Sequence, residues 1–136
     1  VTSRRDFLAQ DPSIDYIFLI GGIGITPVRS IMKEYEITKK QLKGTLLYAN
    51  KDEDYIFGKE LNEIAKNFTN FKILPYFSKR IDEGTLKDLQ SQYPNGVFEL
   101  SGATVFVDEM IGLLKEIGIE DEKIKTSSFH GGYTEI

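Results

Sequence analysis

Three glycines, a threonine and a proline stand close together at Gly21, Gly22, Gly24, Thr26 and Pro27, directly after an apolar run. Glycine allows backbone angles and close approaches that a Cβ forbids, so a ligand can lie against the main chain there. Thr26 can cap a helix, and Pro27 fits its first turn, where a missing N–H costs nothing. Because unpaired amides and the positive end of a helix dipole attract anions, this stretch predicts a phosphate-binding site.

The spacing of these residues differs from two common phosphate-binding patterns. Pro27 stands where the third glycine of G-x-G-x-x-G would be, and no lysine follows as in a P-loop. A plain structural turn is therefore the alternative, since glycine also serves wherever a strand must reverse quickly.

Short apolar runs alternate with helical patterns along most of the chain. The first run, residues 16–20, is apolar throughout, which suits a strand buried on both faces of a parallel sheet. Apolar residues at helical spacing follow it from Val28 to Tyr35. The remaining expected strands cover 44–50, 71–77, 97–100 and 123–128, and the remaining helices cover 56–67, 84–92 and 106–117. Asp52 or Asp54 can cap the helix expected over 56–67.

This alternation predicts an α/β fold with a doubly wound, five-stranded parallel sheet in the order 3-2-1-4-5 and helices on both faces. Pro75 cannot donate to a strand ladder, so the third strand is expected at a sheet edge. Two small-residue loops, 21–27 and 101–104, then follow neighbouring strands where the winding direction reverses. Ligands bind at such a crevice, so we expect the two loops to form one nucleotide cleft.

Composition limits the possible functions. With 136 residues the chain is about one domain long, and 17 basic against 21 acidic residues give a net charge of −4, which argues against a nucleic-acid surface. Cysteine is absent and His130 is the one histidine, so no metal site is expected. No stretch approaches the ~20 apolar residues of a membrane span and no signal-peptide pattern is present, so a cytoplasmic location is expected.

Five short motifs occur in an order that resembles the NAD(P)-binding domain of the ferredoxin–NADP reductase family. They are GGIGITP at 21–27, LYANK at 47–51, RI at 80–81, SG at 101–102 with FV at 106–107, and FHGGY at 129–133. The fourth motif departs from the family pattern, because Ala103 and Thr104 stand where two prolines are common. That difference predicts a looser loop and an altered nicotinamide pocket.

The resemblance implies the NAD(P)H-binding half of a flavin-dependent oxidoreductase, which positions nicotinamide for hydride transfer to FAD and onward electron transfer. The cofactor would be NADH or NADPH, and FAD would be bound mainly by a domain absent from this chain. The fragment alone is then expected to be inactive, and its electron acceptor is unknown. A non-catalytic nucleotide-binding or regulatory module with the same fold is the alternative.

The same resemblance implies roles for particular residues. The pyrophosphate and the nicotinamide side would be held by Gly22, Gly24, Ile25, Thr26 and Pro27. The adenosine ribose would face Asn50 and Lys51, and the nicotinamide would lie beside Ser101, Gly102 and Ala103. An aromatic side chain near the C-terminus would cover a cofactor ring, with Phe129 as the first choice and Tyr133 as the second.

Two of these roles stay open at the level of sequence. Ser101 is expected to position the cofactor, or else only to satisfy local backbone. Lys51 would favour a 2′-phosphate, whereas Asp52 or Glu53 would favour a free 2′-hydroxyl, so the cues on NADH versus NADPH cancel. Arg80 is interpreted as a loop residue near the sheet edge, with cofactor binding as its alternative.

The domain boundary is expected near residue 14. Residues 15–136 form the NAD(P)-binding domain, and residues 1–14 are a linker or the end of a preceding FAD-binding barrel, with a tag-like tail as the alternative. Since the chain begins at Val1 rather than methionine, we expect it to be an excised piece of a longer protein.

Overall fold

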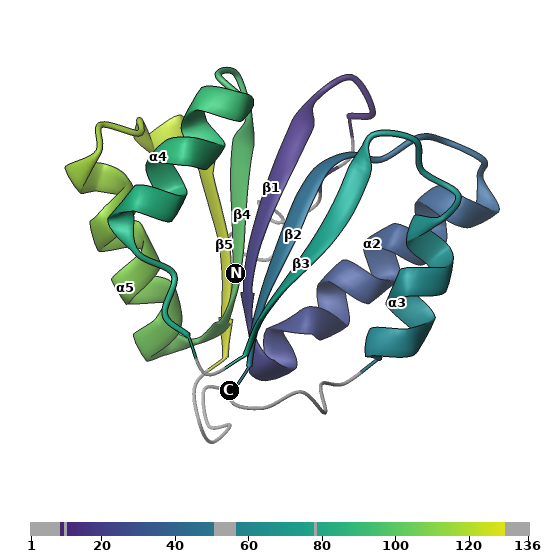
Figure 1. The fold of residues 1–136 in the computed structure, drawn as a ribbon, viewed down its shortest axis with the longest axis horizontal. Coiled ribbons are helices and arrows are strands. Elements are labelled where there is room, and N and C mark those ends of the chain that lie inside the picture. The colour runs from purple at the N-terminus through teal and green to yellow at the C-terminus, as the bar shows by residue number, and fades with distance from the viewer. Residues whose placement is uncertain (1–8, 10, 51–56, 78, 130–136) are drawn as a thin grey trace.

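The computed structural model describes residue 9 and residues 11–50, 57–77 and 79–129, with side chains up to residue 127. Five strands form one parallel sheet in the order β3-β2-β1-β4-β5 (Figure 1). They are β1 (Asp15–Gly21), β2 (Lys43–Asn50), β3 (Phe71–Phe77), β4 (Val97–Ala103) and β5 (Ile124–Phe129). The predicted fold class and strand order are confirmed, and β3 lies at an edge of the sheet, as Pro75 indicated.

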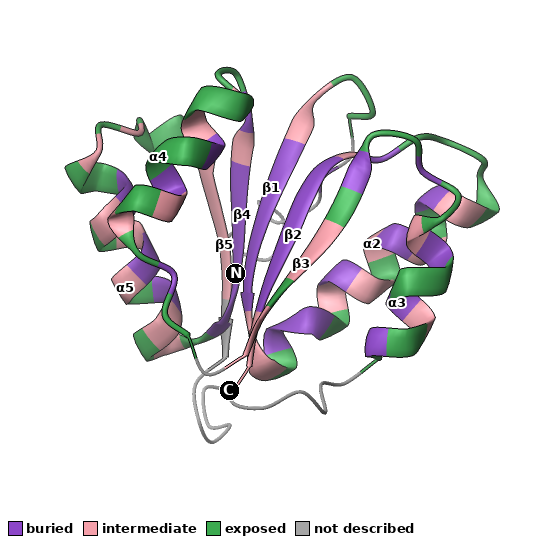
Figure 2. Ribbon diagram, viewed as in Figure 1, coloured by how far each residue is buried: buried purple, intermediate pink, exposed green. Residues whose placement is uncertain are grey.

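Helices cover both faces of the sheet, with α2 and α3 on one side and α4 and α5 on the other (Figure 1). Their bounds are α2 (Ile25–Ile37), α3 (Gly58–Ala65), α4 (Glu83–Gln92) and α5 (Thr104–Glu116), and 3₁₀ turns cover η1 (Gly22–Gly24) and η2 (Asp121–Lys123). Strand β1 is buried at its five central residues, 16–20 (Figure 2). Phe18 packs into the core under α2 and α3, while Leu19 faces the core on the other side, because side chains alternate along a strand.

Three local expectations are wrong. Thr26 does not cap a helix, because η1 runs directly into α2 and Gly24 occupies the N-cap position. Asp52 and Asp54 do not cap α3, which begins at Gly58 with Phe57 at its N-cap in the left-handed region at φ 61°. No loop forms over the expected range 101–104: residues 101–103 are the end of β4, which β5 keeps extended by pairing alongside, and α5 begins at once with Thr104.

Within the part of the chain that the structure describes, every helix is too short or too polar to cross a membrane.

Candidate functional site

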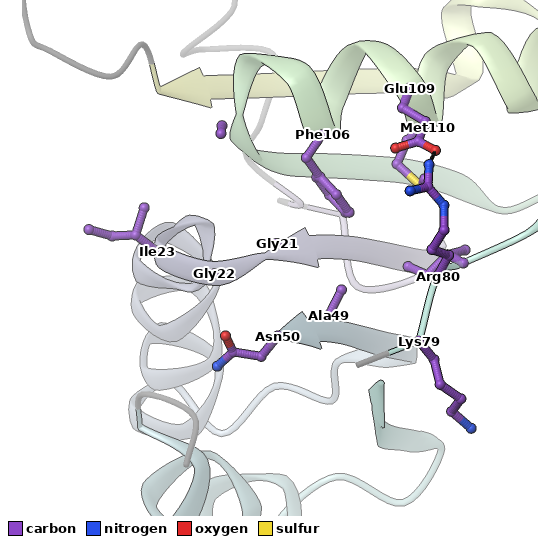
Figure 3. Close-up of a pocket in the computed structure, with 12 residues that line it drawn as sticks. Gly21, Gly22, Ile23, Ala49, Asn50, Lys79, Arg80, Phe106, Glu109 and Met110 are labelled. Atoms are coloured by element: carbon purple, nitrogen blue, oxygen red, sulfur yellow. Dashed lines mark hydrogen bonds and ion pairs between the residues drawn. The ribbon is translucent and has the colours of Figure 1, made fainter. Parts of the chain in front are cut away.

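A cleft of about 580 Å³ opens where the strands end at their carboxyl termini (Figure 3). We refer to it as the switch-point cleft, because it lies where β1 and β4 adjoin and the winding direction reverses. Four segments line it. They are Gly21, Gly22 and Ile23 at the end of β1 and in η1; Ala49 and Asn50 at the end of β2; Lys79, Arg80 and Ile81 after β3; and Ala103, Phe106, Glu109 and Met110 at the end of β4 and in α5. The chain reversals that follow β1 and β4 therefore meet in one cleft, as expected.

Gly24 lies beneath this cleft, against β4. A Cβ on Gly24 would come within 2.4 Å of the carbonyl carbon and oxygen of Ser101, closer than any real Cβ approaches another atom. The missing side chain therefore lets η1 pack directly on the backbone of β4. The sequence had assigned that space to a ligand.

Gly22 has the opposite surroundings. Its φ of +53° is in the left-handed region that favours glycine, and a Cβ there would meet nothing within 4 Å. Since Gly22 lines the switch-point cleft, the open space above it is available to a ligand.

The ring of Phe106 fills the crevice between β1 and β4. A Cβ on Gly21 would lie 2.9 Å from Phe106 Cγ, and a Cβ on Gly102 would lie 3.1 Å from Phe106 Cδ2. Both glycines therefore accommodate this ring. The buried stripe of α5 is formed by Val107, Met110 and Leu114, whereas Phe106 is half-buried and lines the cleft.

The amides at the beginning of η1 differ from the first amide of α2 in their hydrogen bonding. Ile25, the first residue of α2, donates its N–H to the carbonyl oxygen of Gly22. The N–H groups of Gly22 and Ile23 have no acceptor inside the turn, because a helical turn leaves its first amides unpaired. The amides without an acceptor inside a turn are therefore those at the start of η1, one turn before α2.

Ser101 lies in β4 with no exposed surface. Within the described part of the chain, its Oγ makes no hydrogen bond. A buried hydroxyl without a partner is costly, since it has lost water and gained nothing in exchange. Ser101 therefore has an unused donor and acceptor directly beneath η1, although it does not line the cleft itself.

Charged side chains lie at the end of the cleft next to β3. Arg80 forms an ion pair with Glu109 of α5, which joins two segments far apart in the chain. Lys79 lies over the ring of Tyr76, with its Nζ 5.1 Å from the ring centroid. Because Glu109 neutralises Arg80, Lys79 is the cation that adds net positive charge to the described lining of the cleft.

The expected site residues separate into groups. Gly22, Asn50 and Ala103 line the cleft, whereas Gly24, Ile25, Ser101 and Gly102 are buried beneath it. In the first turn of α2, Thr26 is exposed and Pro27 is half-buried, and neither lines the cleft. The backbone of Phe129 pairs with Ala103 at the end of β5, but its side chain, Lys51 and Tyr133 lie outside the described residues.

Sequence reasoning missed several lining residues, namely Ile23, Ala49, Lys79, Ile81, Phe106, Glu109 and Met110. A signal existed for Lys79, because it follows a strand that neighbours β2, and the carboxyl ends of neighbouring parallel strands meet at one edge. No local signal marks Glu109, which looks like any exposed residue of an amphipathic helix.

A family model describing an oxidoreductase NAD-binding domain matches residues 18–95, more than half of the chain. The chain belongs to this NAD-binding domain family. A component of the Na⁺-translocating NADH-quinone reductase from Neisseria meningitidis is 24% identical over 93% of this NAD-binding domain and 35% of its own length. The ferredoxin reductase component of a 3-ketosteroid-9-alpha-monooxygenase from Rhodococcus rhodochrous is 27% identical over 87% of the chain and 35% of its own length.

Solved structures share the fold. A flavohemoglobin from Malassezia yamatoensis, solved with bound FAD and heme, superposes with a TM-score of 0.77 at 27% identity and covers 90% of the NAD-binding domain. Ferredoxin-NADP⁺ reductase from Plasmodium falciparum superposes with a TM-score of 0.68 at 19% identity over 85% of the chain. The chain matches 33% of the flavohemoglobin and 52% of the reductase. It also spans about a third of the curated relatives named above, so they contain further sequence beyond this domain.

Proposed function

We propose that this chain is the NAD(P)H-binding half of a flavin-dependent oxidoreductase, with the switch-point cleft as its dinucleotide site. The single observation that carries the proposal is the convergence of the η1 glycine loop, the end of β2 and the beginning of α5 on one cleft. Such a crevice, at the carboxyl ends of a doubly wound sheet, is where this class of fold takes ligands.

The residues of the cleft suit a dinucleotide in size, polarity and charge. A volume of about 580 Å³ lies within the usual range for small-molecule sites, roughly 300–1,000 Å³. Ala49, Ile81 and Phe106 offer an apolar wall against which a flat ring can pack. The amides of η1 and the ammonium of Lys79 offer hydrogen-bond donors and positive charge to a pyrophosphate.

We assign roles to the residues on this basis. The backbone of Gly22 and Ile23 binds the pyrophosphate over the open space above Gly22. Asn50, at the end of β2, hydrogen-bonds a ribose hydroxyl, as a polar residue at that place does in doubly wound nucleotide domains. Gly24 and Ile25 act indirectly, since they hold η1 on β4. Ser101, with its unused hydroxyl, is a positioning residue for the nicotinamide end.

The redox chemistry would come from the cofactors, with a reduced nicotinamide as the hydride donor and a flavin as the acceptor. The protein's contribution is alignment, because hydride transfer needs reacting atoms held at near-contact distance. No general acid or base is needed for that step, so the proposal requires none of the lining side chains to exchange a proton.

In this proposal the flavin is bound by another domain, and the electron acceptor is not part of this chain. The flavohemoglobin, of which this chain matches a third, was solved with FAD, so we propose that FAD is held mainly by a separate domain that docks at the switch-point cleft. In that arrangement residues 1–14 are the linker to that domain or its last segment, and residues 15–136 are the NAD(P)-binding domain. The cytoplasmic location stays a prediction, and the sequence names no electron acceptor.

One observation favours the second candidate, a nucleotide-binding module without catalysis. Phe106 occupies the crevice beside Gly102, where the nicotinamide side was expected. Reduction of the flavin in the full-length protein separates the two candidates. Anaerobic addition of NADH or NADPH bleaches the flavin absorbance if the first holds and leaves it unchanged if the second holds.

Binding itself is tested on this chain by thermal unfolding with millimolar NADH or NADPH. A ligand that binds only the folded state raises the melting temperature, so we expect an increase with at least one nucleotide. Gly22→Ala, which places a methyl group in the open space, should reduce that increase, whereas Gly112→Ala on the outer surface of α5 should not. A folded chain that shows no increase with either nucleotide would refute the proposed site.

A further inference from the structure

An ion pair between Arg80 and Glu109 lies at the end of the switch-point cleft next to β3. Arg80 comes from the segment between β3 and α4, and Glu109 comes from the second turn of α5, on the opposite side of the sheet's central crevice. Figure 3 shows the guanidinium of Arg80 directed toward Glu109, while Lys79 leaves the chain in the other direction. The pair therefore links both walls of the cleft.

The pair lies in the cleft that also contains the end of β2. In doubly wound nucleotide domains the adenosine ribose faces the end of that strand, and an arginine nearby accommodates a 2′-phosphate when one is present. Asn50 ends β2, and Arg80 lines the same cleft. Arg80 is the arginine among the described lining residues, so its guanidinium is the one that this cleft can offer to a 2′-phosphate.

The guanidinium of Arg80 already forms an ion pair with Glu109. The side chain of Arg80 is 80% exposed, so phosphate can reach it, while that of Glu109 is 38% exposed. A 2′-phosphate and the Glu109 carboxylate would compete for the same planar donor group, since both accept paired N–H bonds from a guanidinium.

We propose that Glu109 acts as a built-in competitor for Arg80 and thereby makes the site discriminate against 2′-phosphorylated nucleotides, so that NADH is preferred over NADPH. The inference rests on the proposed dinucleotide site and adds its specificity. Glu109 is a specificity residue that acts through Arg80, and it needs no contact with NADH.

The test measures binding of 2′,5′-ADP and 5′-AMP by calorimetry at low ionic strength to the wild-type chain, Glu109→Gln, Arg80→Gln and the double variant. Both probes lack nicotinamide, so a missing flavin domain does not influence the comparison. Glu116→Gln is the matched control, because Glu116 is exposed on the same helix and does not line the cleft.

Exposed ion pairs stabilise weakly, so Glu109→Gln should tighten 2′,5′-ADP binding by about threefold to fivefold and leave 5′-AMP binding nearly unchanged. Adding Arg80→Gln to Glu109→Gln should remove that gain, and Glu116→Gln should show none. A gain that persists in the double variant would overturn the inference, because it would reflect only lost negative charge. Equal effects on both probes, or no gain, would also overturn it.

The same binding measurements distinguish an error in the proposed dinucleotide site from an error in the role of Glu109. If the wild-type chain binds neither 5′-AMP nor NADH, the dinucleotide site itself is wrong, and the specificity inference is refuted with it. If 5′-AMP and NADH bind but Glu109→Gln changes nothing, the site stands and the role of Glu109 is refuted.

Discussion

An added methyl group at Gly24 should disrupt the direct backbone contact between η1 and β4. The ideal Cβ of an alanine would lie 2.4 Å from the carbonyl carbon and oxygen of Ser101 and 2.6 Å from the amide nitrogen of Gly102. All three atoms are backbone atoms of β4, so no side chain can rotate away. To restore ordinary contact, η1 and β4 would have to separate by about 1 Å at the centre of the sheet.

The size of the effect follows from that geometry. Overpacking a core costs about 1–3 kcal/mol when neighbouring side chains can adjust. Here only backbone can move, so Gly24→Ala should lower the free energy of unfolding by about 3 kcal/mol or more. A domain of this size is stable by roughly 5–15 kcal/mol, so the variant should still fold and be measurable.

Two other glycines provide matched controls. Gly22→Ala meets no atom within 4 Å but keeps a φ of +53°, so it should cost only about 1–2 kcal/mol. Gly112→Ala lies inside α5 and also meets nothing within 4 Å, so it should stabilise the chain by about 0.5–1 kcal/mol.

Urea unfolding followed by circular dichroism measures all three variants on one scale. With a denaturant dependence of about 1–3 kcal/mol per molar urea, Gly24→Ala should unfold at least about 1 M earlier than the wild type. If Gly24→Ala is as stable as Gly22→Ala, then β4 and η1 are not in direct backbone contact, and the explanation given for Gly24 is wrong.

Two further predictions concern titrating groups. Asp82 caps α4, because its carboxylate accepts hydrogen bonds from the N–H and the hydroxyl of Thr85, each at 2.9 Å. These hydrogen bonds lower the pKa of the Asp82 carboxyl below 3.8. The stabilisation of the folded state by Asp82 should therefore be complete above that pH and should be lost as the pH falls through the lowered pKa. In pH-dependent urea unfolding, Asp82→Asn should keep the cap and lose this dependence, whereas Asp82→Ala should be less stable throughout the neutral range. Burial raises the pKa of Tyr35 from 10.0 to about 12, and its hydroxyl donates to the carbonyl oxygen of Ala9 at 2.6 Å. Because the phenol ionises at a lower pH in the unfolded chain, the stability of the fold should decrease as the pH rises from about 10 to 12. Tyr35→Phe should flatten that part of the profile, and an unchanged slope would contradict the assignment.

The strand order could be predicted from the sequence because it depends on local patterns and general chirality. Apolar runs that alternate with amphipathic helices leave few parallel arrangements, and right-handed crossovers select among them. Pro75 placed β3 at the edge for an equally local reason, its missing N–H. The glycine loop after β1 marked the place of the cleft in the same way.

Only the tertiary structure decided what each small residue does. Gly22 and Gly24 are two positions apart and look equivalent in sequence, yet one faces open space and the other packs on the backbone of β4. The pairing of Arg80 with Glu109 was equally invisible, because it joins residues 29 positions apart. Local spacing determines which elements form, whereas the approach of two backbones or two charges depends on how distant elements pack, and that is settled only when the sheet is assembled.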